Sequence, residues 1–125
     1  MDRKSILVSL RPEISYELKY GEMSPEEKFQ NEVLRPILKF QHELLSSVFN
    51  VYLRKKNIDT TKWDTPTKEK YIQKILSHDL ILRNTLIGMI IGMMDEAEFL
   101  IYSDHEPELR NRISRMIGQR VISQI

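Results

Sequence analysis

The clearest pattern in the chain is a stripe of apolar residues that follows Ser24-Pro25-Glu26-Glu27. A serine can cap a helix, proline suits the first helical position, and a glutamate three residues after the cap completes a capping box. The stripe recurs at spacings of three and four, through Phe29, Val33, Ile37, Phe40, Leu44, Val48 and Tyr52. This spacing predicts a long amphipathic helix whose apolar face packs into a globular core.

A proline interrupts this predicted helix. Pro36 has no backbone N–H to donate, and it disfavours helical geometry at Arg35. A straight helix over residues 25–56 would be about 48 Å long. A domain of this size has a radius of gyration of only about 14 Å. We therefore expect a kink or a break at Leu34–Pro36.

The segment 80–94 is the most apolar part of the chain. Its apolar residues are Leu80, Ile81, Leu82, Leu86, Ile87, Met89, Ile90, Ile91, Met93 and Met94. A helix that is apolar on nearly every side is typical of a buried position, so we expect a central helix at about 79–93. Gly88 and Gly92 lie four residues apart on one face, which predicts a close approach by another helix.

Helix-start signals divide the rest of the chain. Thr65-Pro66 predicts one start, Ser77-His78-Asp79 provides a possible cap, and Asp95-Glu96-Ala97-Glu98 predicts another start. A last helix is expected from about Glu106 to Gln124. No segment alternates for long enough to be a strand. The predicted fold class is all-α, an irregular bundle of five or six helices.

Residues 1–23 show no clean helical period, because a proline, a glycine and scattered charges interrupt every pattern. We expect an extended arm here, with at most one short helix near Ser5–Leu10, followed by a single helical domain over residues 24–125. Arms of this kind often cross to a second subunit, so a homo-oligomer is possible.

Composition narrows the classes of function. The chain has 125 residues, the size of one domain, and its 19 basic and 18 acidic residues leave a formal net charge of +1. Dedicated nucleic-acid binders usually carry a clear excess of basic residues, so this near balance argues against that class of protein. The absence of cysteine excludes disulfides and thiol catalysis. The longest weakly polar stretch is shorter than the roughly 18 residues of a membrane span, so we expect a cytoplasmic protein without a membrane contact.

The charges are unevenly distributed. Residues 54–74 hold seven basic and three acidic residues, whereas residues 84–108 hold six acidic residues and no lysine or arginine. This distribution has three interpretations. The two segments are complementary patches that pair subunits, or the basic segment binds phosphate or RNA, or both segments are ordinary solvated helix faces.

One charge lies inside the apolar segment. Arg83 must either pair with a carboxylate or reach the surface. Its possible carboxylate partners are Glu32, Glu43 and Asp79. In the alternative interpretation the charge belongs to an anion-binding pocket. The candidate ligand-binding residues for such a pocket are Arg35, Gln41, Arg83 and Asn84.

The sequence offers no catalytic or metal-binding pattern. None of the three histidines, His42, His78 and His105, has a histidine partner three or four residues away. No phosphate-binding loop, nucleophile elbow or dinucleotide fingerprint occurs. We therefore predict no catalytic residues, no metal and no cofactor.

Two stretches carry a resemblance to known proteins. FQNEVLRPILKFQ at 29–41, followed by RNTLIGMIIG at 83–92, resembles a family of short all-helical bacterial proteins, some of which carry the name glyoxalase. The resemblance covers most of the chain beyond residue 10 and identifies no functional residues. The name implies a metal-dependent lyase or thioester hydrolase. The strand-borne metal ligands of one glyoxalase type and the histidine-rich motif of the other are not found in this sequence.

The leading hypothesis is a non-enzymatic cytoplasmic helical module for interaction or structure, which associates with itself. A glyoxalase-like metal-dependent lyase or a binder of small anionic ligands is the first alternative. A weak nucleic-acid binder that uses residues 54–74 is the second.

Overall fold

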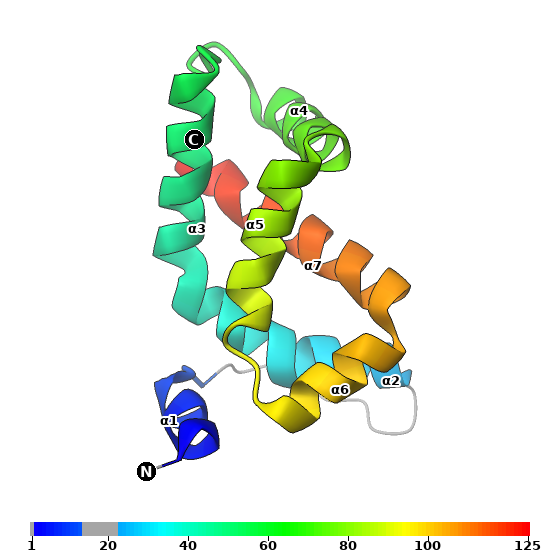
Figure 1. The fold of residues 1–125 in the computed structure, drawn as a ribbon. Coiled ribbons are helices and arrows are strands. Elements are labelled where there is room, and N and C mark those ends of the chain that lie inside the picture. Colours follow the sequence, from blue (N-terminus) through cyan, green and yellow to red (C-terminus); the bar gives the residue numbers. More distant parts are fainter. Residues whose placement is uncertain (1, 14–22) are drawn as a thin grey trace.

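The structure is a computed structural model that describes residues 2–13 and 23–125. Its elements are α1 (Arg3–Leu10), α2 (Pro25–Phe29), the π-helix η1 (Gln30–Leu34), α3 (Arg35–Lys55), α4 (Thr65–His78), α5 (Leu80–Ile91), α6 (Glu96–Asp104), α7 (Glu106–Val121) and the 3₁₀-helix η2 (Ile122–Gln124). The described residues contain helices and no strands, and they form an irregular arrangement (Figure 1). The predicted all-α irregular bundle is confirmed.

The long helical segment formed by α2, η1 and α3 bends next to Pro36, as the sequence predicted. The backbone N–H of Arg35 donates to the carbonyl of Gln30, five residues earlier, which is the π-helical pattern. This wider turn lies directly before Pro36, which cannot donate a backbone hydrogen bond. The chain changes direction between η1 and α3 (Figure 1), so the helix kinks and does not break.

Aspartate caps fix where three of the other helices begin. Asp64, Asp79 and Asp95 each accept a hydrogen bond from the backbone N–H three residues later, at the starts of α4, α5 and α6. At α6 the side chain of Glu98 completes a capping box. The end of α3 is followed by Asn57 with a φ of 56°, a left-handed conformation that asparagine tolerates.

The core lies where α3, α4, α5 and α7 meet. Its fully buried side chains include Leu38, Leu45, Phe49, Ile72, Leu76, Leu86, Ile90, Leu109 and Ile113. Helix α5 contacts α3, α4 and α7, which gives it the central position expected for the apolar segment. No helix in the described ranges is long and apolar enough to cross a membrane.

One side of α5 is nevertheless open. Leu82 and Leu86 are buried, but Ile81 is 82% exposed. A Cβ added at Gly88 would meet no heavy atom of the described residues within 4 Å. The prediction that Gly88 and Gly92 mark a close helix contact is therefore wrong within this chain. The physical reason is that α3, α4 and α7 occupy the other sides of α5, so the space over Gly88 stays open, while the Gly92 carbonyl accepts a hydrogen bond from Arg3 of α1 at 3.0 Å.

Two arginines hold the N-terminal segment against the body. Arg3 donates hydrogen bonds of 2.7 and 3.0 Å to backbone carbonyls that follow α5. Arg11 forms a bidentate pair with Glu98 of α6, at 2.6 Å for each bond. The expected short helix is present as α1, so this part of the arm is helical, and residues 14–22 of the arm lie outside the described residues.

Candidate functional site

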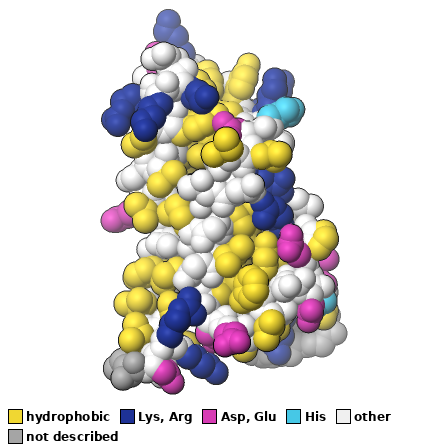
Figure 2. All heavy atoms as spheres, viewed as in Figure 1, with side chains coloured by type: hydrophobic (Ala, Val, Ile, Leu, Met, Phe, Trp, Pro, Cys, Tyr) yellow, Lys and Arg dark blue, Asp and Glu magenta, His cyan; other side chains and the backbone are white. Residues whose placement is uncertain are grey.

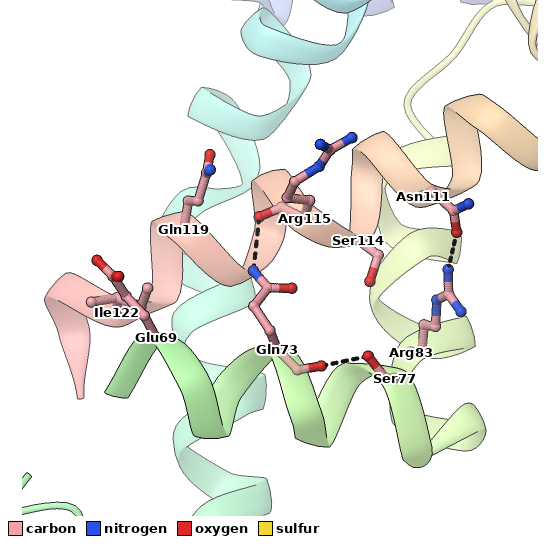
Figure 3. Close-up of a pocket in the computed structure, with 9 residues that line it drawn as sticks. All are labelled: Glu69, Gln73, Ser77, Arg83, Asn111, Ser114, Arg115, Gln119 and Ile122. Atoms are coloured by element: carbon pink, nitrogen blue, oxygen red, sulfur yellow. Dashed lines mark hydrogen bonds between the residues drawn. The ribbon is translucent and has the colours of Figure 1, made fainter. Parts of the chain in front are cut away.

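A polar groove runs between α4 and α7, with α5 at one end (Figure 3). Its volume is about 610 Å³. The lining residues are Glu69, Gln73 and Ser77 of α4, Arg83 of α5, Asn111, Ser114, Arg115 and Gln119 of α7, and Ile122 of η2. Glu69 lies at one end of the groove and Arg83 at the other (Figure 3), so the two ends carry opposite charges.

The groove forms because α4 and α7 each turn one polar stripe toward it. The α4 residues recur at every fourth position, and the α7 residues recur at intervals of three and four, which places each set on a single helix face. The two helices approach each other closely at Gly118, where an added Cβ would lie 2.3 Å from the Gln73 side-chain nitrogen and 3.3 Å from Leu76 Cδ1. Close packing thus uses Gly118, which the sequence analysis did not single out.

Hydrogen bonds fix several of the lining side chains. The side-chain amide of Gln73 donates to the backbone carbonyl of Arg115 at 3.3 Å, and the Ser77 hydroxyl donates to the carbonyl of Gln73 at 2.7 Å. Arg83 Nη2 donates to Asn111 Oδ1 at 2.8 Å (Figure 3). The groove is therefore bridged from α4 to α7 and from α5 to α7.

Arg83 has no ion-pair partner among the residues that the structure describes. Its Nε is buried and has no hydrogen-bond partner there. The carboxylate of Asp79, one of the three expected partners, instead caps α5 and accepts the Tyr52 hydroxyl at 2.8 Å. The guanidinium is thus held by an uncharged amide at the end of an open groove, and of the alternatives for Arg83 the pair with a carboxylate is not formed among the described residues.

The four predicted ligand-binding residues lie in different surroundings. Only Arg83 is among the nine residues that line the groove. Asn84 accepts a hydrogen bond from Arg110 of α7, and Gln41 donates to a carbonyl of α5 at 3.1 Å. Arg35 is exposed at the start of α3. The burial of Arg120 and the positive charge of Arg35 lower the pKa of Arg120.

Most of the groove residues were not predicted from the sequence. Gln73, Ser77, Asn111 and Ser114 were not predicted, although their regular spacing along α4 and α7 is a detectable signal. Polar residues on one helix face are ordinary at a surface. Only the crossing of the two helices shows that these stripes face each other.

The histidines lie apart in the described structure. The Nδ1 of His42 is buried and has no hydrogen-bond partner among the described residues. His78 Nδ1 lies 2.8 Å from a backbone carbonyl, and His105 Nδ1 lies 3.0 Å from Glu26 Oε1. The described residues contain no group of three or more histidine, aspartate or glutamate side chains that could hold a metal ion.

A second, more apolar hollow lies beside the end of α3. It has a volume of about 750 Å³ and includes a stacked pair, Trp63 and Tyr71, with ring centroids 4.8 Å apart. Burial and the neighbouring Asp79 raise the pKa of Tyr52. Hydrogen bonds from the Leu82 backbone and the Tyr52 hydroxyl lower the pKa of Asp79. Tyr52 and Asp79 both line this hollow.

A third feature is the exposed surface of α3 and α5, which lie side by side (Figure 1). We define the α3–α5 face as the exposed residues Phe40, Leu44, Ile81, Thr85, Gly88 and Gly92. In Figure 2, hydrophobic side chains gather over α3 and beside α5, while lysine and arginine side chains lie at the top, at the bottom and in a cluster at mid-height on the right. The face is therefore apolar and poor in charge.

Comparisons with models of known protein families, with curated proteins and with solved structures find no match to this chain. The glyoxalase-like and nucleic-acid alternatives stay predictions. The proposals below rest on the chain's own residues.

Proposed function

We propose that the protein is a non-enzymatic helical interaction module that associates with a second copy of itself through the α3–α5 face. A cytoplasmic location is part of this proposal, and fractionation of the producing cells tests it. The observation that carries the proposal is the combination of exposed large apolar side chains with an uncovered glycine, Gly88, on the same face. Phe40 is 43% exposed, Leu44 is 54% exposed, and the space over Gly88 is open in the described structure.

Exposed apolar surface supports an interface because covering it releases water. Burial contributes about 25 cal/mol for each Å² of apolar surface. Single exposed apolar residues are common on monomers, whereas a contiguous patch is typical of an interaction site. The α3–α5 face places such residues on two adjacent helices, which Gln41 bridges by its hydrogen bond to the carbonyl of Met89.

The glycines support a helical partner in particular. A glycine inside a helix is less favourable than alanine by about 1 kcal/mol. No side chain of the described residues occupies the space over Gly88, so the fold of one chain does not use the absence of its Cβ. A second helix that lies on Gly88 and Gly92 would approach the α5 backbone closely and would offset this penalty.

A second copy is the partner that we propose, because the face is compatible with itself. A two-fold dimer brings the same surface of both copies together. Like charges that face each other across an interface are unfavourable, and the α3–α5 face is poor in charge (Figure 2). Two copies can therefore meet on this face without charge repulsion.

Light scattering coupled to size-exclusion chromatography tests the proposal. The wild-type chain is expected to elute as a dimer, and Phe40→Glu is expected to elute as a monomer because it places a charge in the interface. Phe99→Glu is the matched control, since Phe99 on α6 is 42% exposed and Phe40 is 43% exposed. Circular dichroism confirms that both variants fold.

Two results would overturn the proposal. One is a wild-type chain that stays monomeric at every accessible concentration. The other is equal dissociation by Phe40→Glu and Phe99→Glu, which would show that the α3–α5 face is not the interface.

A further inference from the structure

We infer that the polar groove between α4 and α7 binds a small molecule through its phosphate or carboxylate group, with Arg83 as the main anion-binding residue. The inference is independent of self-association, because none of the groove residues belongs to the α3–α5 face. It goes beyond the proposed function in that it assigns a ligand site.

The first argument is the state of the Arg83 guanidinium. A partly buried charge without a counter-charge is unfavourable. Asn111 and the enclosure of Nε fix the position of this group, while Nη1 has no hydrogen-bond partner within residues 2–13 and 23–125. The guanidinium is therefore held at the end of the groove without a counter-charge, which an anion in the groove would supply.

The second argument is Ser114. Its exposed fraction is only 7%, and its hydroxyl points into the groove (Figure 3). The hydroxyl of a helical serine often donates a hydrogen bond to the backbone carbonyl four residues earlier, as the hydroxyls of Ser46 and Ser77 do at 2.9 and 2.7 Å. The described residues show no such bond for Ser114, so its hydroxyl is available to a ligand.

The third argument is the arrangement of donors. Because Asn111 Oδ1 accepts from Arg83, the NH₂ group of the same amide is available as a further donor. Arg83, Asn111 and Ser114 come from two helices and lie at the same end of the groove (Figure 3). Arginine donors match the oxygen geometry of carboxylates and phosphates, and such charge-assisted bonds are stronger than neutral ones.

The shape of the groove sets the size and orientation of the ligand. Small-molecule sites typically have volumes of about 300–1,000 Å³. The volume of about 610 Å³ exceeds what a bare phosphate ion fills. Glu69 repels an anion from the opposite end, so the acidic group belongs at the Arg83 end and the remainder of the molecule extends along α4 and α7 (Figure 3).

Titration of ¹⁵N-labelled full-length protein with inorganic phosphate, and separately with acetate, tests the inference at constant ionic strength. The expected result is saturable shifts at Ser77, Asn111 and Ser114, and the tighter probe identifies the ligand group. Arg83→Gln is expected to weaken binding by about tenfold or more, and Ser114→Ala by several-fold. Arg83→Lys keeps the charge but loses the forked donors, so it is expected to bind weakly while folding normally.

Arg35→Gln is the matched control. It removes the same charge, but Arg35 is exposed at the start of α3 and is not among the residues that line the groove, so binding is expected to change little. Equal weakening by Arg83→Gln and Arg35→Gln would overturn the inference, because it would indicate non-specific attraction. The absence of saturable shifts with both probes, or shifts confined to residues 54–68 outside the groove lining, would overturn it as well.

Discussion

Replacement of Gly88 by alanine separates the folding of one chain from the association of two. The new Cβ meets no heavy atom of the described residues within 4 Å, so the helix propensity of α5 is the main quantity that changes within a chain. Alanine is favoured over glycine in a helix by about 1 kcal/mol. The free energy of unfolding of the monomer is therefore expected to rise by about 1 kcal/mol, which raises Tm by about 4 °C for a chain of this size.

The assay is urea unfolding in the Phe40→Glu background, where the chain is expected to be monomeric. The dimer is measured separately, by light scattering of Gly88→Ala in the otherwise wild-type chain. If a second helix lies on Gly88, the added methyl group occupies space that the partner backbone needs. Gly88→Ala is then expected to weaken the dimer although it stabilises the monomer.

Gly118→Ala provides the matched comparison. The gain in helix propensity is the same, but the new Cβ would lie 2.3 Å from the Gln73 side-chain nitrogen and 3.3 Å from Leu76 Cδ1. Gln73 must turn away and lose its hydrogen bond to the Arg115 carbonyl, a loss of about 1 kcal/mol. The variant is expected to be no more stable than the wild type, and less stable than Gly88→Ala by about 1–2 kcal/mol. A destabilised Gly88→Ala monomer, or equal stabilisation by both variants, would refute the reasoning.

Three further predictions concern the core, the helix caps and the N-terminal helix. Phe49→Ala removes a fully buried ring and is expected to lower the free energy of unfolding by about 3–5 kcal/mol, measured by urea titration. Because the pKa of Asp79 is lower in the folded than in the unfolded chain, its carboxylate stabilises the fold above about pH 3.9. That contribution is lost as the pH falls through the folded-state pKa, so a pH series of unfolding curves is expected to show a smaller acid-induced loss for Asp79→Asn than for the wild type. Glu98→Gln removes the counter-charge of Arg11, and faster hydrogen exchange across α1 is expected, whereas unchanged protection of α1 would contradict this assignment.

Local signals in the sequence predicted most of the fold. The Asp79 and Asp95 caps and the kink at Pro36 are interactions within a few residues, so the residues themselves determine them. Exposure is different, because it depends on how many helices remain to cover a given face. The sequence could show that α5 is apolar, but not that Ile81 and Gly88 stay open.

The residues of the candidate site likewise divide into those that local sequence indicated and those that only the fold brings together. Arg83 could be singled out from the sequence alone, because a charge inside an apolar helix must be paired or reach the surface. The regular spacing of Ser77, Asn111 and Ser114 is visible in the sequence, but only the crossing of α4 and α7 brings their polar stripes together. The tight glycine contact likewise lies at Gly118, where that crossing requires it.

Distances between spin labels on two copies of the chain test self-association through the α3–α5 face most directly. The chain has no cysteine, so Thr85→Cys and Ser103→Cys each provide a single labelling position, the first on this face and the second on exposed α6. The expected result is a defined inter-chain distance for the Thr85 label that is shorter than the distance for the Ser103 label. Absence of inter-chain coupling at both positions, or a shorter distance at Ser103, would contradict association through this face.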